Sequence, residues 1–306
     1  MEIRRVGRTG LRVSSIGLGT LTWGRDTDEH DAATQLRDFL DAGGNLLDTA
    51  GSYGEGRSET VIGELLDGEV NREDVVISTK SGVRGGSVDA SRGNLLSSLD
   101  ASLARLGTDY VDLWFVHAPD PHTPITETVS AMKHAIASGR ARYVGLSNFS
   151  AWQSAQVATM LEGDPGLAAA QVEYSLLARD IEIEMIPAAA GLGLGVLAWS
   201  ALGRGVLTGK YRHSVPADSR AASPHLRGFV DPYLTQSARS IVEAVHAAAE
   251  GLGRTAAEVA LAWTRDAPEV SSALIGARTP AQLSGLLSAT DLDLPGEIRD
   301  VLDEVS

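Results

Sequence analysis

Four side chains with complementary acid–base chemistry stand at or just after the ends of short apolar runs. The carboxylate is Asp48 in LLDTAGSYGEG, and the phenol is Tyr53 in the glycine-rich stretch that follows. The ammonium is Lys80, directly after VVIST, and the imidazole is His117, directly after DLWFV. Taken alone, each has an ordinary interpretation: a turn cap, a ring over an apolar edge, a solvated loop lysine, a structural histidine. Their occurrence after neighbouring apolar runs favours one common site.

The four groups together suit the protonation of a reacting oxygen. Tyrosine has an unperturbed pKa near 10, so it is a weak proton donor at neutral pH. A neighbouring Lys80 ammonium is expected to lower the pKa of Tyr53, and Asp48 to hold Lys80 by a charge-assisted hydrogen bond. His117 is expected to orient a substrate carbonyl, whose oxygen gains negative charge as hydride adds to its carbon. No side chain of the protein donates hydride, so a cofactor must supply it.

Apolar runs alternate with amphipathic stretches along the chain, which is typical of a parallel sheet covered by helices. We expect eight strands, at Ser15–Leu18, Asn45–Asp48, Val75–Thr79, Val111–His117, Tyr143–Ser147, Ala169–Glu173, Gly195–Trp199 and Ser272–Ile275. We expect helices at His30–Ala42, Arg57–Leu66, Ser91–Leu106, Ile125–Ser138, Ala151–Leu161, Ile181–Ala190, Ala256–Thr264 and Pro280–Ala289. This pattern predicts an α/β fold, a single (β/α)8 or TIM barrel over residues 1–306. Active sites of such barrels lie at the carboxyl ends of the strands, where the four groups stand.

Several segments fall outside the plain repeat. The opening MEIRRVGRTGLRVSS predicts a hairpin around Gly7–Gly10 that covers the barrel floor. The long loop Ala201–Thr235 follows the seventh strand, and loops of this length are often functional. Extra helices are expected near Gln236–Glu250 and, at the C-terminus, near Glu297–Val305. Asp89 is placed to cap the third helix.

Composition excludes several classes of function. A formal net charge of −14 argues against non-specific binding to nucleic acid, which needs a basic face. No run approaches the roughly 18 apolar residues of a membrane span, and the N-terminus lacks the apolar core of a secretory signal. The absence of cysteine fits a reducing, cytoplasmic environment. No histidine pair has metal-ligand spacing on a regular element, so no metal site is expected.

Longer motifs make the chain resemble the aldo-keto reductases over essentially its whole length. They include GNLLDTAGSYGEGRSETVIGELL, SLDASLARLGTDYVDLWFVHAPD, VGLSNF, QVEYSLLAR, VLAWSALGRGVLTGKY and LIGARTPAQL. The resemblance is to the branch with potassium-channel β subunits and bacterial general-purpose reductases. It implies an NAD(P)(H)-dependent enzyme that interconverts carbonyls and alcohols, with Asp48, Tyr53, Lys80 and His117 as the catalytic tetrad. Arg278, the basic residue of LIGARTPAQL, favours NADP(H) as the cofactor.

The resemblance also implies the residues that hold the cofactor. Those matching the nicotinamide end are Ser147, Asn148 and Gln171 for the carboxamide and Trp199 for the ring. Those matching the pyrophosphate site are Ser200, Leu202, Gly203, Arg204, Gly205 and Lys210, in which Arg204 and Lys210 supply positive charge. Those matching the adenosine end and its 2′-phosphate are Gly276, Arg278 and Gln282. The chain departs from the family at Leu286, where an asparagine often contacts adenine.

The substrate and the biological setting stay open at this stage. Trp23 matches a position that lines the substrate pocket, and packing under a loop is an equal alternative. A small-molecule carbonyl is the expected substrate, and a homo-oligomer is left open. An alternative function is a nicotinamide-binding, redox-sensing regulatory subunit with slow turnover. A metal-dependent barrel hydrolase is disfavoured because histidines are few.

Overall fold

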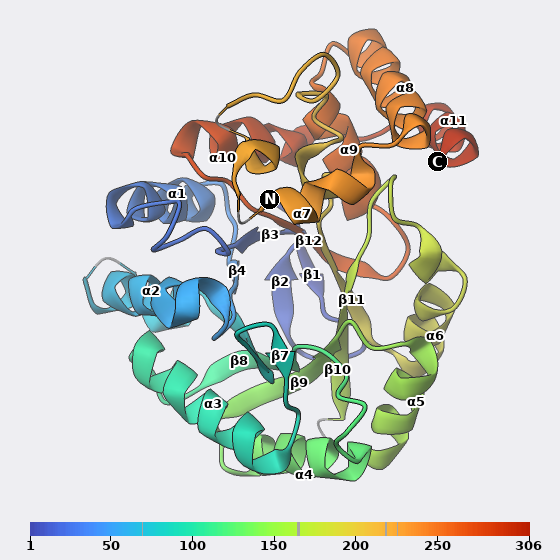
Figure 1. Ribbon diagram of the computed structural model, residues 1–306. Coiled ribbons are helices and arrows are strands. Elements are labelled where there is room, and N and C mark those ends of the chain that lie inside the picture. Colours follow the sequence, from blue (N-terminus) through green and yellow to red (C-terminus); the bar gives the residue numbers. More distant parts are fainter. Residues whose placement is uncertain (69, 164–165, 218, 225) are drawn as a thin grey trace.

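A closed barrel of eight parallel strands forms the centre of the molecule (Figure 1). The computed structural model describes residues 1–306 except 69, 164–165, 218 and 225. The barrel strands are β3 (Ile16–Gly19), β4 (Leu46–Asp48), β5 (Val76–Ser81), β8 (Val111–Val116), β9 (Ala141–Ser147), β10 (Leu167–Glu173), β11 (Gly195–Trp199) and β12 (Val270–Ile275). Each strand pairs in parallel with the next, and β12 closes on β3. The prediction of a (β/α)8 barrel is confirmed.

Eight helices surround the strands and supply the outer layer of the barrel (Figure 1). They are α1 (Glu29–Asp41), α2 (Arg57–Gly68), α3 (Arg92–Leu106), α4 (Ile125–Ala137), α5 (Ala151–Met160), α6 (Met185–Leu192), α9 (Ala256–Arg265) and α10 (Pro280–Leu287). In α3 the buried positions Leu95, Leu99 and Leu106 recur at helical spacing, and Gly107 ends the helix in the left-handed conformation with φ 63°.

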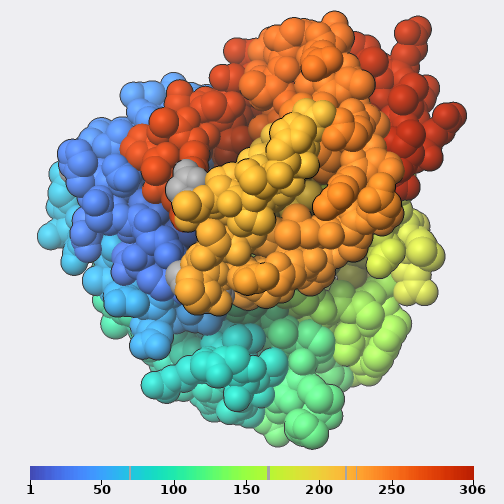
Figure 2. Space-filling model, turned by 45° about the horizontal axis from the view of Figure 1, so that its top comes forward, coloured from blue at the N-terminus to red at the C-terminus, as the bar shows by residue number. Residues whose placement is uncertain are grey.

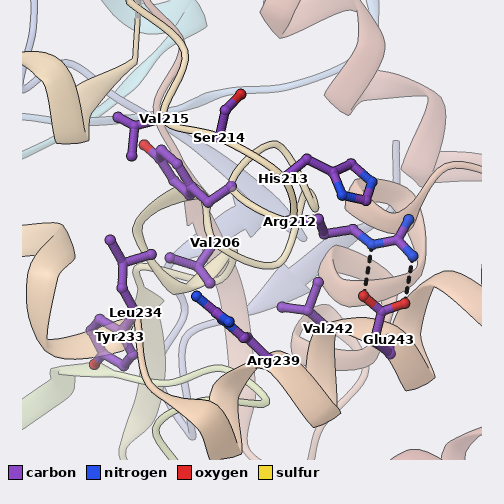
Figure 3. A pocket seen from close by; sticks show the side chains of 11 residues that line it. Val206, Arg212, His213, Ser214, Val215, Tyr233, Leu234, Arg239, Val242 and Glu243 are labelled. Carbon is purple, nitrogen blue, oxygen red and sulfur yellow. Dashed lines mark hydrogen bonds and ion pairs between the residues drawn. The ribbon is translucent and has the colours of Figure 1, made fainter.

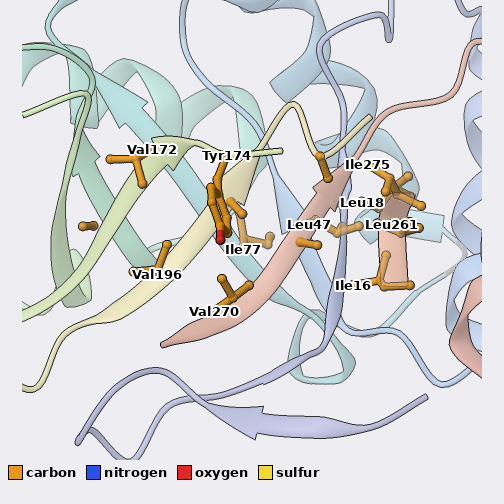
Figure 4. Close-up of a cluster of buried hydrophobic side chains, with 14 of the residues drawn as sticks. Ile16, Leu18, Leu47, Ile77, Val172, Tyr174, Val196, Leu261, Val270 and Ile275 are labelled. Atoms are coloured by element: carbon orange, nitrogen blue, oxygen red, sulfur yellow. The ribbon is translucent and has the colours of Figure 1, made fainter. Parts of the chain in front are cut away.

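Side chains along each strand alternate between two apolar layers. Leu46 and Phe115 point into the barrel, whereas Leu47 and Trp114 belong to the larger layer between strands and helices. Figure 4 shows part of that outer layer, with Ile16, Leu18 and Leu47 among the labelled side chains. This alternation follows from the two-residue period of a strand.

Two local predictions are wrong. Asp89 does not cap α3, because the residue before the first helical residue is Ser91; the Asp89 carboxylate instead accepts a hydrogen bond from the Ser91 N–H. The predicted helix Ile181–Ala190 begins as a separate 3₁₀ turn, Asp180–Glu182, and α6 starts only at Met185. Glu182 is held there by two hydrogen bonds from Arg179 and one from Tyr174, which fix the turn apart from the helix.

The N-terminal hairpin closes the barrel floor as predicted. Its strands β1 (Ile3–Arg5) and β2 (Arg12–Ser14) pair antiparallel, and Val6 and Val13 join the apolar cluster inside the barrel. Gly7 passes so close to the chain before β11 that a Cβ there would lie 2.2 Å from the carbonyl oxygen of Gly193. Its φ of +53° also favours glycine.

The remaining elements lie outside the repeat of barrel strands and outer helices. They are the hairpin β6 (Val83–Arg84) and β7 (Ser87–Val88), the helices α7 (Arg227–Val230), α8 (Gln236–Leu252) and α11 (Gly296–Val305), and the 3₁₀ turns η1 (Tyr53–Gly56), η2 (Arg72–Asp74), η4 (Gly203–Gly205), η5 (Arg220–Ala222), η6 (Asp231–Tyr233) and η7 (Ser288–Asp291). The predicted extra helices correspond to α8 and α11 and are confirmed. Figure 2 shows the described parts of residues 201–235, in yellow and orange, lying across the visible face. Among the described residues, no helix combines the length and apolarity needed to cross a bilayer.

Candidate active site

The four predicted acid–base residues converge at the carboxyl rim of the barrel. Asp48 is the last residue of β4, Lys80 lies near the end of β5, and His117 directly follows β8. Tyr53 is the first residue of η1, in the loop after β4. They meet because parallel strands of a barrel all end at the same rim.

The ion pair between Lys80 and Asp48 is almost completely buried. The Lys80 Nζ lies 2.7 Å from Asp48 Oδ2 and donates a second hydrogen bond of 2.8 Å to the carbonyl oxygen of Thr49. The other Asp48 oxygen accepts from the Ser78 hydroxyl at 2.6 Å and from Gln171 Nε2 at 2.8 Å. Although burial opposes it, the attraction of Asp48 raises the pKa of Lys80, so Lys80 is an ammonium at neutral pH.

Tyr53 is placed to exchange a proton beside this fixed positive charge. Its hydroxyl lies 3.3 Å from Lys80 Nζ. Burial raises the pKa of Tyr53, and Lys80 opposes that rise without cancelling it. The expected net lowering of the pKa of Tyr53 is therefore wrong for this structure, because the cost of burying a phenolate exceeds the attraction of the ammonium. Tyr53 carries its proton at neutral pH and is a donor.

His117 is a neutral imidazole next to the tyrosine. Burial and the Lys80 charge lower the pKa of His117 to about 4, partly offset by Asp48. The His117 and Tyr53 rings meet edge to face with centroids 6.2 Å apart. The His117 Nδ1 is buried and has no hydrogen-bond partner in the described part of the chain. Nε2 is thus the ring nitrogen left to meet a ligand.

A second group of predicted residues forms a connected wall beside the tetrad. Asn148 donates to the carbonyl oxygen of His117 at 3.0 Å and to the Ser147 hydroxyl at 3.1 Å. The Trp199 indole N–H donates to Asn148 Oδ1 at 3.2 Å. Ser147 and Gln171 are buried, whereas Trp199 is partly exposed at the rim. The structure therefore brings together all four residues predicted to meet the nicotinamide end.

The turn after β11 has an unusual, mostly left-handed backbone. Ser200, Gly203, Arg204 and Gly205 all have positive φ, between 54° and 92°. The N–H groups of Gly203 and Gly205 donate to the carbonyl oxygens of Ser200 and Leu202, and the Arg204 N–H donates to the Ser200 hydroxyl, so the turn is held by its own hydrogen bonds. Leu202 lies within this turn, and a Cβ added at Gly205 would lie 2.9 Å from Lys210 Nζ.

Arg204 is occupied differently from the sequence-based prediction. Its guanidinium forms two hydrogen bonds with Glu173, at 3.0 and 2.8 Å, and a third with the carbonyl oxygen of Phe229 at 2.6 Å. It also lies between 5.1 and 5.6 Å from the ring centroids of Trp199, Phe229 and Tyr233. Its charge is balanced by Glu173, so in this structure Arg204 joins α7 to the barrel rim instead of supplying charge to a phosphate.

A further arginine, Arg220, lies near the residues predicted to meet the adenosine end of the cofactor. A Cβ added at Gly276, after β12, would lie 3.3 Å from Arg220 Nη2. Burial lowers the pKa of Arg220, and the positive charge of Arg278 lowers it further. No motif marked Arg220, one of four arginines in the loop Ala201–Thr235. Two neighbouring cations favour an anion between them.

Three other predicted positions have structural contacts. Gln282 accepts a hydrogen bond from the Arg278 N–H at 2.9 Å and so braces the loop before α10. Leu286 packs into the core. Trp23 is fully buried, and its indole N–H donates to Gln35 at 3.2 Å. The packing alternative for Trp23 describes this structure, since a side chain without exposed surface cannot line a pocket.

A separate hollow lies between residues 206–215 and α8 (Figure 3). It has a volume of about 220 Å³, an apolar base at Val206 and Val242, and an ion pair between Arg212 and Glu243 at its edge. Arg239 points from α8 toward Val206 in this view. Among the described residues lining it, none belongs to the tetrad, so its chemistry is distinct from that of the rim.

The chain is similar to a known family over nearly its whole length. The model of the Aldo/keto reductase family matches residues 15–306. The chain is 37% identical over 315 residues to a protein of Oryza sativa subsp. japonica named "Probable voltage-gated potassium channel subunit beta", covering 100% of this chain and 95% of the relative. It is also 37% identical over 321 residues to the uncharacterized oxidoreductase YrpG of Bacillus subtilis (strain 168), covering 100% and 96%. The chain belongs to the aldo/keto reductase family. The family and the Bacillus relative support an oxidoreductase function.

Proposed function

We propose that this protein is an NADPH-dependent reductase of aldehydes and ketones. The observation that carries the proposal is the buried Lys80–Asp48 pair, with the Tyr53 hydroxyl 3.3 Å from the Lys80 ammonium. A protonated phenol beside a fixed cation is suited to protonate an oxygen that becomes an alkoxide. A small-molecule carbonyl is the substrate that this arrangement fits.

Each residue of the tetrad has a separate role in the proposed carbonyl reduction. The nicotinamide cofactor, when bound, supplies the hydride. His117, neutral at physiological pH because its pKa is about 4, donates from Nε2–H to the carbonyl oxygen and orients it. Tyr53 transfers its proton to the same oxygen, and Lys80 stabilises the phenolate that remains. Asp48 keeps Lys80 charged and fixed.

The choice of NADP(H) over NAD(H) is supported by the charges at the adenosine end. Members of this family generally use nicotinamide cofactors. A 2′-phosphate is a dianion, and a chain with a net charge of −14 repels it unless cations stand at the point of contact. Arg278, whose charge lowers the pKa of Arg220, and Arg220 itself are the cations proposed to make that contact.

The test is NADPH oxidation, followed by absorbance, across a panel of aldehydes, ketones and quinones. Tyr53→Phe keeps the ring and removes the proton, so turnover should fall roughly 10²–10⁴-fold. Binding of NADPH should change little, because the hydroxyl faces the substrate. Near wild-type turnover of Tyr53→Phe would remove Tyr53 from the acid role.

A regulatory role is the second candidate, because the Oryza relative is named as a potassium-channel subunit. In that case a nicotinamide would copurify with the protein, turnover would be slow, and a stable complex with a partner would form. Fast multiple turnover with a simple aldehyde and no partner would favour the enzyme.

A further inference from the structure

The loop that carries Tyr53 has a strained backbone. The three residues after Tyr53 all have positive φ: Gly54 at 55°, Glu55 at 60° and Gly56 at 92°. A non-glycine residue in the left-handed region costs free energy, and such a conformation persists only where the surroundings hold it. The support for this loop therefore decides where the Tyr53 hydroxyl stands.

Arg105, from α3, lies directly beneath both ends of this loop. A Cβ added at Gly56 would come within 2.7 Å of Arg105 Cδ and Nε, and one added at Gly51 within 3.2 Å of its Nη2. The guanidinium also donates to the Ser102 hydroxyl at 3.2 Å. The loop rests on the arginine stem, and glycine is what permits this close approach.

Glu59 connects that arginine to the strand that carries Lys80. Its side chain has no exposed surface, and one carboxylate oxygen accepts from Arg105 Nε at 2.8 Å and Nη2 at 2.6 Å. The other oxygen accepts from the hydroxyl of Thr79, the neighbour of Lys80 on β5, at 2.5 Å. One buried carboxylate thus ties the support of the Tyr53 loop to the strand of the ammonium.

We propose that Glu59 and Arg105 are positioning residues that set the distance between the Tyr53 hydroxyl and the Lys80 ammonium. Neither touches the reacting atoms; they act through the loop and through β5. The inference rests on the proposed function, because the distance matters only if Tyr53 is the proton donor. A misplacement of about 1 Å can lower a rate by about 10²-fold.

A matched control pair, Arg72 and Asp112, lies at the amino end of β5 and β8. Arg72 donates to Asp112 at 2.7 Å, and the same Asp112 oxygen accepts from the Ile77 N–H on β5. Like Glu59, Asp112 ties an arginine to β5, but it does so at the amino end of the barrel. Loss of the Arg72–Asp112 pair should lower the stability of the protein without moving the tetrad.

The experiment compares Glu59→Gln, Arg105→Gln and Arg105→Lys with Arg72→Gln. We expect kcat for an aldehyde to fall about 10- to 100-fold in the first two, with KM changed less than about threefold. Arg105→Lys should recover part of the loss, because a cation again meets Glu59. The pH–rate profile of Glu59→Gln and of Arg105→Gln should shift toward higher pH. A Lys80 ammonium that is displaced from Tyr53 lowers the pKa of the phenol less. Arg72→Gln should keep kcat within about twofold of wild type.

A second readout does not depend on the reaction. Hydrogen–deuterium exchange of the cofactor-free protein should be at least about tenfold faster over residues 50–56 in Arg105→Gln, and unchanged there in Arg72→Gln. Unchanged exchange in Arg105→Gln would overturn the inference, as would equal losses of kcat in Arg105→Gln and Arg72→Gln. A wild-type protein that reduces no carbonyl would instead refute the proposed function, and the exchange result would still decide whether this pair holds the loop.

Discussion

Replacing Lys80 by methionine tests the electrostatic design of the site directly. The substitution keeps most of the side-chain volume and removes the ammonium from a place where both partners are at most 5% exposed. Removing one partner of a buried ion pair costs about 3–5 kcal/mol. Ser78 and Gln171 still donate to Asp48, so we expect a loss near the lower end, about 3 kcal/mol. For a chain of this size, that lowers Tm by roughly 4–6 °C.

The effect on turnover follows from the distance between Lys80 and Tyr53. At 3.3 Å, the attraction between an ammonium and a phenolate is about 5 kcal/mol at an effective dielectric constant of about 20. Asp48 raises the pKa of Tyr53 and so offsets part of this attraction. We therefore expect kcat of Lys80→Met to fall roughly 10²–10³-fold.

The assay pairs steady-state NADPH oxidation with thermal unfolding of Lys80→Met and of the double variant Lys80→Met, Asp48→Asn. Removing both charges leaves no unpaired carboxylate, so the double variant should recover much of the lost stability. It should recover none of the lost turnover, because the ammonium beside Tyr53 is still absent. Recovery of turnover in the double variant, or a loss of less than about threefold in Lys80→Met, would refute the proposed role of Lys80.

Further predictions concern the cofactor and pH. Arg278→Ala and Arg220→Ala should each weaken NADPH binding by roughly 10- to 100-fold and leave NADH binding almost unchanged, as measured by quenching of tryptophan fluorescence; equal losses for both cofactors would contradict this. Because the folded-state pKa of His117 is about 4, below its unfolded value, stability should fall as pH drops from about 6.5 to 4, and His117→Asn should flatten that slope in unfolding experiments. Because the pKa values of Lys80 and Tyr53 are raised, the folded protein holds more protons above about pH 10, so Tm should fall there as pH rises, and less steeply in Lys80→Met.

The sequence was sufficient for the barrel because its pattern is repeated and local. Each buried run that ends in a polar residue, such as LLD before Thr49, predicts both a strand and the rim where it ends. Parallel strands in a closed barrel then leave only one edge for Asp48, Lys80 and His117, so their convergence follows from topology. Caps and helix starts do not follow from the pattern alone. A carboxylate such as that of Asp89 can accept a hydrogen bond from an N–H before the helix as well as from one in its first turn.

The sequence was insufficient where a group has several partners to choose from. Arg204 stands in a glycine-rich turn whose sequence predicts a phosphate site. In the folded chain its guanidinium instead pairs with Glu173 and lies over three aromatic rings. Whether the pKa of Tyr53 is raised or lowered depends on how far the fold buries the phenol from solvent, and no sequence motif gives that burial. Arg220 becomes a candidate for phosphate binding only in the folded chain, where the charge of Arg278 acts on it.

The neutralisation of Arg204 by Glu173 has a kinetic consequence. With that cation balanced, Arg220 and Arg278 are left as the proposed contacts for a phosphate, on a molecule whose net charge is −14. A dinucleotide diffusing toward the barrel is repelled by the net charge, and local cations attract its phosphates. We expect its phosphate-bearing adenosine to be captured first, and the nicotinamide to swing in afterwards. The bimolecular rate of capture should therefore depend on ionic strength, whereas the later rearrangement should not.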